Sequence, residues 1–199
     1  MQKAIVLLSG GIDSCVALSC ALSQKRECLA LSFDYGQRHS IELESAKKIA
    51  SHCGTSHTII RIDDALFANS SSSLLNSKMS ALSSTYVPSR NLLFFAHAAC
   101  FAEANNASEI YFGANSDDYE NYPDCRPEFI EAFERAISNG SEHRVKIVTP
   151  LIKLTKEQIG SLGRELNSPL DLTWSCYDPQ KKNTPCERCL ACLLRSKAL

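Results

Sequence analysis

Two adjacent glycines flanked by hydroxyl side chains follow the first apolar run of the chain, in residues 9–14 (SGGIDS). The apolar run at 3–8 predicts a buried strand and residues 14–24 predict a helix, so the glycines form the turn between them. Glycine lets the backbone approach a ligand closely, and the first turn of a helix offers free N–H groups to an anion. We therefore predict that this turn binds phosphate. The residues expected to face a phosphate-bearing cofactor are Leu8, Ser9, Gly10, Gly11, Ile12, Asp13, Ser14, Cys15, Val16, Ala17 and Leu18.

The turn differs from the two common nucleotide-binding loops. It lacks the Gly-Lys-Ser/Thr ending of a Walker A loop and the third glycine of the dinucleotide fingerprint. Asp13 is an acidic residue beside a predicted phosphate site. Its presence indicates either a Mg²⁺ ion that joins the two charges or a carboxylate that fixes the loop through backbone N–H groups.

A second group of polar residues consists of two segments, one after the second predicted strand and one at the start of an apolar helix predicted at 89–104. Residues 35–39 (YGQRH) follow the second predicted strand, and residues 86–91 (YVPSRN) lead into the helix. Arg90 falls in the first helical turn, where the helix dipole disfavours a cation. A bound anion explains an arginine there, and a solvated or ion-paired arginine is the alternative. His39 is the histidine that we expect to contact a ligand.

A third polar segment, residues 113–126, follows the predicted strand at 109–112. In open α/β sheets, ligands bind beyond the carboxyl ends of the strands, where the strand order reverses. If the first and fourth strands are neighbours, residues 9–14 and 113–126 meet over one crevice.

Four of the ten cysteines are crowded near the end of the sequence, at Cys176, Cys186, Cys189 and Cys192. Thiolates at two-residue intervals favour one structural zinc ion with four sulfur ligands and no open position. An iron–sulfur cluster and free thiols are the alternatives. The basic residues around this group are expected to form a solvated face: Lys181, Lys182, Arg188, Arg195 and Lys197. The remaining cysteines are expected to be small buried apolar side chains: Cys15, Cys20, Cys28, Cys53, Cys100 and Cys125.

Strand and helix signals alternate along the chain, which predicts an α/β fold with a mostly parallel sheet. The expected strands are 3–8, 27–33, 57–62, 109–112 and 145–149, and the expected helices are 14–24, 40–54, 89–104, 127–139 and 155–167. The serine-rich segment 67–85 is either an ordered lid or disordered.

The composition restricts the function classes. Hydrophobic residues make up 44% of the chain, and 21 basic against 22 acidic residues leave a net charge of -1. This balance opposes electrostatic wrapping of nucleic acid, and no apolar run approaches the roughly 18 residues of a membrane span. The N-terminus lacks a signal-peptide pattern, so we expect a cytoplasmic protein with no membrane partner.

The glycine turn resembles the PP-loop of the ATP pyrophosphatases. Further motifs narrow the resemblance to the 7-cyano-7-deazaguanine synthase family over nearly the whole chain: YGQRH, the Pro-x-Arg-Asn helix start, YPDCRP, Thr155-Lys156, Ser175-Cys176-Tyr177 and the cysteine group. The resemblance implies a Rossmann-like (adenine nucleotide alpha hydrolase-like) parallel sheet flanked by helices. It also implies a nucleotide-binding domain at 1–170 and a small zinc-binding subdomain at 171–199. The family commonly has glycine where this chain has Glu187.

By that resemblance, the chain is an ATP-dependent ligase of queuosine biosynthesis. It would convert 7-carboxy-7-deazaguanine and ammonia into 7-cyano-7-deazaguanine through an adenylated intermediate and an amide. ATP, Mg²⁺ and one structural Zn²⁺ are the expected cofactors, and the family implies a homodimer without a nucleic-acid partner. The residues expected to be catalytic are Asp13, Ser14, Arg90 and Asp124. Those expected to bind substrate are Arg38, His39, Arg90, Asn115, Asp118, Tyr122, Asp124 and Arg126.

Within that assignment, Arg90 would bind the substrate carboxylate or the α-phosphate. Asp118 and Asp124 would hold the guanine-like edge or help to deprotonate ammonia. Two other hypotheses stay open: another PP-loop enzyme that modifies tRNA (a thiolase or lysidine-forming ligase), and a non-enzymatic zinc-ribbon binding module.

Overall fold

The computed structural model describes residues 1–37, 41–75, 85–119, 122–180 and 184–199. Its centre is a five-stranded sheet in which all paired strands are parallel, in the order β3-β2-β1-β4-β5. The strands are β1 Lys3–Leu7, β2 Glu27–Asp34, β3 Ser56–Arg61, β4 Glu109–Tyr111 and β5 Lys146–Val148. The helices are α1 Ile12–Ser23, α2 Ile41–His52, α3 Arg90–Ala104, α4 Pro127–Gly140, α5 Lys156–Glu165 and α6 Leu190–Ala198. The predicted α/β class and parallel sheet are confirmed.

The strand order reverses beside β1. Ile5 of β1 pairs with Leu29 of β2 on one side and with Ile110 of β4 on the other. The chain therefore leaves β1 and β4 at neighbouring carboxyl ends, where ligands of open α/β sheets bind. The predicted meeting of residues 9–14 and 113–126 is confirmed, because a Cβ on Gly113 would lie only 2.9 Å from the carbonyl carbon of Asp13.

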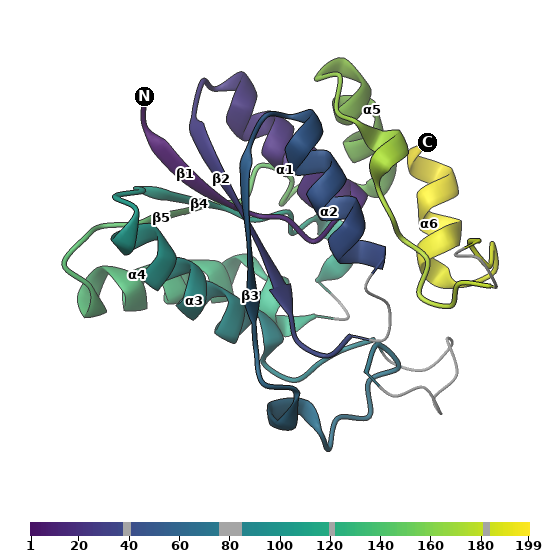
Figure 1. The fold of residues 1–199 in the computed structure, drawn as a ribbon, viewed down its shortest axis with the longest axis horizontal. Coiled ribbons are helices and arrows are strands. Elements are labelled where there is room, and N and C mark those ends of the chain that lie inside the picture. The colour runs from purple at the N-terminus through teal and green to yellow at the C-terminus, as the bar shows by residue number, and fades with distance from the viewer. Residues whose placement is uncertain (38–40, 76–84, 120–121, 181–183) are drawn as a thin grey trace.

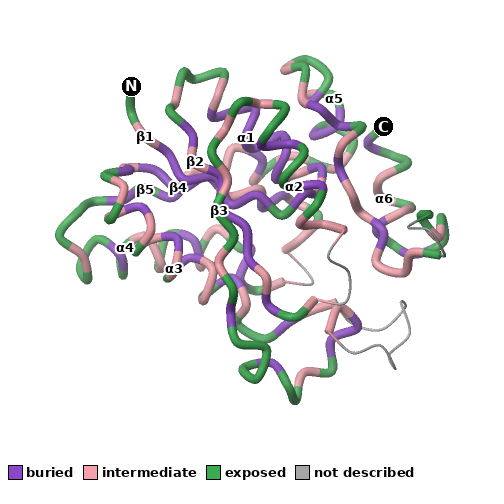
Figure 2. Tube along the Cα trace, viewed as in Figure 1, coloured by how far each residue is buried: buried purple, intermediate pink, exposed green. Residues whose placement is uncertain are grey.

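Helices cover both faces of the sheet, with α1 and α2 on one face and α3 and α4 on the other (Figure 1). The alternation of side chains along β1 produces this division. Ala4 and Val6 pack toward α1 and α2, whereas Ile5 and Leu7 pack toward α3 and α4. The central strands β1 and β4 are accordingly almost wholly buried (Figure 2).

The C-terminal helix α6 joins the outer side of the fold through α5. A Cβ on Gly160 of α5 would lie 1.8 Å from the carbonyl oxygen of Ala198, so the two backbones are in close contact. Arg164 Nη1 also donates a hydrogen bond of 2.8 Å to the Ala198 carbonyl. The sequence analysis did not predict α6.

Two features are less buried than the sequence pattern indicates. Helix α3 is apolar nearly all round, yet it buries one side only, and Leu92, Ala96 and Cys100 form an exposed row at four-residue spacing. The sheet and α4 cover the opposite side, which includes Phe95. Cys100 is therefore exposed and Cys53 is half-buried, while the other four isolated cysteines are buried as expected.

The question of a lid over the crevice falls mostly outside the described residues. The described part of segment 67–85 is 67–75 together with Thr85, and within it Ser72 and Ser73 are buried. Within the described ranges, no helix has the length and apolar character required to cross a bilayer.

Candidate active site

The glycine turn has the geometry of an anion-binding loop. Gly10 adopts a φ of 92°, and Gly11 is the N-cap of α1 without a side-chain cap. The Ser14 hydroxyl donates to the Gly11 carbonyl at 3.0 Å, and the Ser9 amide donates to the Ser14 hydroxyl at 3.2 Å. The Trp174 amide donates to the Gly10 carbonyl at 2.9 Å. The turn is thus held by hydrogen bonds within residues 9–14 and by one from Trp174 in the C-terminal part of the chain. The uncapped N–H groups of α1 lie at the carboxyl ends of the strands, where the crevice is.

Replacing Gly10 with alanine is expected to distort this turn. A Cβ there would lie 2.2 Å from the Glu42 carbonyl oxygen of α2, and the positive φ adds strain. We expect a loss of about 2 to 4 kcal/mol in the free energy of unfolding, measured by urea denaturation. Gly140→Ala is the matched control, because nothing lies within 4 Å of its Cβ position. Equal stability of the two variants would contradict this description of the turn.

Two adjoining cavities lie over the carboxyl ends of the strands. The strand-end cavity, of about 240 Å³, is lined by the ends of β1 and β2 together with Ser14 and Arg90. The C-terminal cavity, of about 600 Å³, reaches Lys156, Trp174 and Arg195. The residues that line both cavities are Ser9, Asp13, Glu42, Thr85, Asp118, Tyr122 and Tyr177. The glycine turn therefore lies at the border between two ligand-sized spaces.

Asp13 forms an ion pair with Lys156 of α5 at this border. Burial would lower the pKa of Lys156, but the charges of Asp13 and Asp118 raise it above its ordinary value. The second oxygen of Asp13, Oδ1, is buried without a hydrogen-bond partner in the described chain. Asp13 does not fix the loop through backbone N–H groups of the described residues. An orphaned carboxylate oxygen beside a phosphate loop fits a Mg²⁺ ligand.

Asp118 and Tyr122 confirm the prediction that the third loop reaches the crevice. Burial, together with the nearby charge of Asp13, raises the pKa of Asp118 to about 6 against the opposing charge of Lys156. The hydroxyl of Tyr122 forms a hydrogen bond with the hydroxyl of Thr85. Asp118 is therefore a carboxylate able to exchange a proton near neutral pH.

Arg90 lies in the first turn of α3, as predicted, and lines the strand-end cavity. Its Nη1 donates to the Tyr35 hydroxyl at 3.1 Å, and its guanidinium lies 5.6 Å from the centre of the Tyr35 ring. Its Nε is buried with no acceptor among the residues of the described ranges. An anion that enters this cavity finds a fixed guanidinium with an unused donor.

Of the predicted cofactor-facing residues, Gly10, Cys15, Val16, Ala17 and Leu18 line neither cavity, and the last four are fully buried in the core because α1 turns that side toward the sheet and α5.

Three of the predicted catalytic and substrate-binding residues also lie outside the walls of both cavities. Asp124 is buried, and its Oδ2 accepts from the Asn91 amide at 3.0 Å, so it caps the start of α3. Asn115 Oδ1 accepts from the Asp117 amide at 2.9 Å and begins a short 3-10 helix. Arg126 donates its Nε to the Tyr119 carbonyl at 2.9 Å. Each of these side chains fixes local backbone instead of facing the crevice. Arg38 and His39 lie outside the described residues.

Several cavity residues were absent from the predicted site. They are Glu42, Thr85, Asp117, Lys156, Trp174, Ser175, Tyr177 and Arg195. The expectation that Arg195 belongs to a solvated face is wrong, because its Nη1 donates to the Thr173 hydroxyl at 2.6 Å and its Nη2 to the Leu170 carbonyl at 3.2 Å. Three of the missed residues stand in motifs that carry the family resemblance, Lys156 in Thr155-Lys156 and both Ser175 and Tyr177 in Ser175-Cys176-Tyr177, and this was the available sequence signal.

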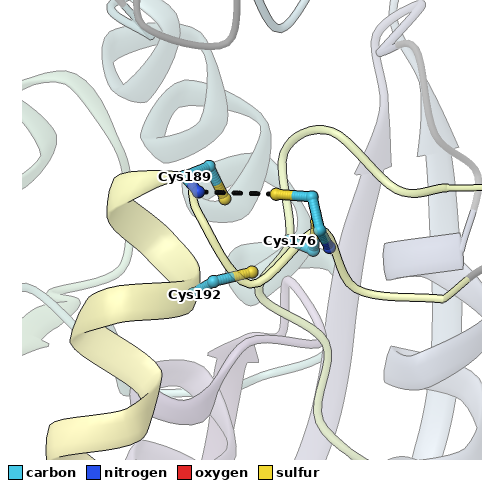
Figure 3. A group of neighbouring side chains, drawn as sticks. Cys176, Cys189 and Cys192 are labelled. Carbon is cyan, nitrogen blue, oxygen red and sulfur yellow. Dashed lines mark hydrogen bonds between the residues drawn. The ribbon is translucent and has the colours of Figure 1, made fainter.

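The four predicted cysteine ligands come together. Sγ atoms of Cys176, Cys186, Cys189 and Cys192 all lie within 4.8 Å of one another. Figure 3 shows the side chains of Cys176, Cys189 and Cys192 turned toward a common centre, two from the start of α6 and one from the preceding loop. The Cys186 amide donates to Cys176 Sγ at 3.2 Å, and the Cys189 amide donates to Cys186 Sγ at 3.4 Å. The sulfurs of a zinc tetrahedron lie about 3.8 Å apart, so this arrangement fits a single metal ion.

Glu187 occupies a left-handed position inside this metal site, with a φ of 59°. Glycine adopts this conformation without the steric cost that a side chain carries. We expect Glu187→Gly to stabilise the metal-loaded protein by about 0.5 kcal/mol, since relief of strain exceeds the added freedom of the unfolded chain. The melting temperature of the metal-loaded protein measures this effect. A lower melting temperature would show that the Glu187 side chain makes a stabilising contact.

Comparison with known proteins places the whole chain in one group. Residues 3–199 match the family described as "Queuosine biosynthesis protein QueC". A protein of Leptospira interrogans named 7-cyano-7-deazaguanine synthase is 49% identical over 208 residues, which cover 98% of this chain and 86% of that protein. A protein of Picrophilus torridus with the same name is 46% identical over 209 residues, which cover 99% of this chain and 87% of that protein.

The fold is also found in a solved structure of low sequence similarity. An NMN synthetase from Francisella tularensis superposes with a TM-score of 0.56 at 19% identity, over 94% of this chain and 71% of that one. At this identity, the likeness supports the fold alone.

Proposed function

The chain belongs to the queuosine biosynthesis protein QueC family, and from this premise we propose that it makes 7-cyano-7-deazaguanine from 7-carboxy-7-deazaguanine, ammonia and ATP. One observation carries the proposal from the structure. The uncapped start of α1, the unused Nε of Arg90 and the orphaned oxygen of Asp13 surround adjoining cavities. These groups can hold a triphosphate next to a second ligand.

The first step is activation of an inert acid. A carboxylate resists attack by ammonia, because its negative charge repels nucleophiles and it has no good leaving group. In the proposed step, a carboxylate oxygen attacks the α-phosphorus of ATP, the bond to the β-phosphate oxygen breaks, and pyrophosphate leaves. The N–H groups of residues 9–14 bind the departing pyrophosphate, and Lys156 stabilises the charge that develops on the α-phosphate. Arg90 neutralises the acid or the α-phosphate and orients it.

Mg²⁺ is the expected companion of the triphosphate. Asp13 Oδ1 would hold it, and the ion would neutralise phosphate charge when bound. The ion pair to Lys156 through Oδ2 keeps the Asp13 side chain in this position. Ser14 contributes by fixing the turn, because its hydroxyl bridges Ser9 and Gly11.

Two further steps lead to the nitrile. Ammonia attacks the adenylated carbonyl carbon, AMP leaves with the former carboxylate oxygen, and an amide results. Asp118 accepts the proton that the incoming ammonium must lose, which suits a carboxyl group with a pKa of about 6. The amide oxygen is then adenylated by a second ATP, and loss of AMP with two N–H protons leaves the carbon–nitrogen triple bond.

Other parts of the proposal concern the assembly around the site. We propose that the four-cysteine site binds one structural Zn²⁺ and that residues 171–199 form the zinc-binding subdomain beside a nucleotide-binding domain at 1–170. A cytoplasmic homodimer is also proposed. The exposed leucines of the C-terminal segment support the dimer, since Leu190, Leu193 and Leu199 are 60%, 51% and 53% exposed.

The function is tested with the purified protein, ATP, Mg²⁺, ammonium and 7-carboxy-7-deazaguanine. Mass spectrometry should detect the nitrile, with two AMP formed for each nitrile. Modification of tRNA in place of the acid would favour a PP-loop enzyme of RNA, and no ATP consumption with either substrate would favour a binding module. Elemental analysis distinguishes zinc from iron.

A further inference from the structure

Glu42 is a charged residue of the cavity walls to which the reaction described above gives no role. Glu42 lies in the first turn of α2 and lines both cavities. Within the described ranges, its carboxylate forms neither a hydrogen bond nor an ion pair. Burial raises the pKa of Glu42 to about 7, against the opposing charge of Arg90. A half-buried carboxylate without a partner is costly to the fold, which favours a ligand that supplies donors.

Glu42 differs from the other acidic residues that line the cavities. Asp13 uses one oxygen in its ion pair with Lys156. Asp117 Oδ2 accepts from the Lys156 amide at 3.0 Å, and Asp118 Oδ2 accepts from the Asn115 amide at 3.4 Å. Glu42 is therefore the one acidic residue of the described cavity walls that offers both oxygens to a ligand.

The surroundings of Glu42 suit a flat, uncharged ring edge. Tyr177 also lines both cavities and presents an aromatic side chain near Glu42. Arg90 lies in the strand-end cavity but forms no ion pair with Glu42, so both charges remain available to one bound molecule. A molecule with an anionic group and a separate pair of donors complements this arrangement.

We propose that Glu42 binds the donor edge of the deazaguanine ring and so determines the base specificity of the enzyme. Ring N1–H and the exocyclic 2-amino group are neighbouring, parallel donors, and the two oxygens of one carboxylate accept both. The inference rests on the proposed function, because it takes its substrate from there. It also replaces the expected role of Asp124 at this edge, because Asp124 lies outside both cavities, and it leaves Asp118 with the alternative role of accepting a proton from ammonium.

The first test needs no variant. Binding of 7-carboxy-7-deazaguanine to the wild-type protein is compared by calorimetry with binding of the analogue that lacks only the 2-amino group. A site built to accept a donor rejects a ligand without it, so we expect the analogue to bind at least about 100-fold more weakly. Equal affinities would overturn the proposal.

The second test compares Glu42→Gln with Glu44→Gln, which changes an exposed carboxylate two positions along the same helix. Glutamine places a donor against one of the two ring donors. We expect Glu42→Gln to weaken binding of the acid by about 30-fold or more, with unchanged ATP affinity and an unchanged or higher melting temperature without ligand. Glu44→Gln should leave all these values unchanged. The affinity for the analogue should fall much less in Glu42→Gln than the affinity for the acid.

Two results would contradict this role for Glu42. Equal weakening of ATP and acid binding would assign the residue to the nucleotide site or to the fold, and unchanged acid binding would exclude contact with the substrate. Failure of the proposed function is distinguishable from both, because the wild-type protein would then form no nitrile from the acid.

Discussion

Asp13→Asn is expected to reduce turnover by about a hundredfold to a thousandfold while the fold persists. Asparagine keeps the shape of the side chain but removes the negative charge that holds Lys156 and would hold Mg²⁺. Both partners of the ion pair are only partly exposed, at 25% for Asp13 and 16% for Lys156, so the lost charge is poorly replaced by water. The loss falls on the step in which charge moves onto pyrophosphate, where a single electrostatic contact contributes a hundredfold to a thousandfold.

The measurement is exchange of labelled pyrophosphate into ATP in the presence of the carboxylate substrate. Exchange reports adenylation separately from the later reaction with ammonia. Asp171→Asn, which changes an exposed carboxylate on a short 3-10 helix, is the control and should exchange at the wild-type rate. If the Asp13→Asn protein exchanged pyrophosphate at the wild-type rate, Asp13 would have no part in adenylation.

The second large effect is expected from Cys189→Ser. Cys189 is buried at the N-cap of α6, and its sulfur lies among the other three cysteine sulfurs. A structural metal binds the folded protein only, so loss of one ligand lowers stability as well as metal content. We expect the melting temperature to fall by about 10 °C, which corresponds to about 3 to 5 kcal/mol in a domain of this size.

The same substitution should also affect activity, because Trp174, Ser175 and Tyr177 flank Cys176 and line the C-terminal cavity. Cys100→Ser is the matched control, since Cys100 is exposed on α3 and far in sequence from the cluster. A Cys189→Ser protein that melts like the parent and retains its metal would argue against a structural ion.

The features that could be predicted from the sequence are those that depend on residues close together in the chain. Residues 9–14 were predicted as an anion-binding turn because glycines between a strand and a helix act locally. The cysteine site was also predicted, since its spacing is imposed by one ion. The strand order itself was not predicted: the adjacency of the first and fourth strands was a condition of the predicted crevice, and the observed order meets it.

Residues whose roles depend on tertiary contacts escaped prediction. Glu42 and Arg195 face the cavities only because α2 and α6 pack where they do, and no local pattern distinguishes them from solvated charges. Asp124 shows the converse error. Its position beside other polar loop residues suggested the crevice, but its carboxylate turns toward the Asn91 amide at the start of α3. Sequence spacing places such side chains near a site without specifying their direction.

The cavity walls carry polar groups that lack partners in the described part of the protein, which lowers the stability of the fold but leaves these groups available to ligands. Of the three buried side-chain polar atoms without a partner among the described residues, Asp13 Oδ1 and Arg90 Nε belong to residues that line the cavities, and Asn115 Nδ2 lies outside the walls. Unpaired buried groups weaken a fold, and their concentration around one pair of cavities is consistent with groups reserved for ligands.

The most direct test of the account follows oxygen from the substrate. With 7-carboxy-7-deazaguanine labelled with ¹⁸O in both carboxylate oxygens, adenylation transfers one oxygen to AMP at the acid and the other at the amide. Mass spectrometry should therefore find one ¹⁸O in each AMP and none in pyrophosphate. Label in inorganic phosphate or pyrophosphate, or unlabelled AMP, would contradict activation of the acid at the α-phosphate of ATP.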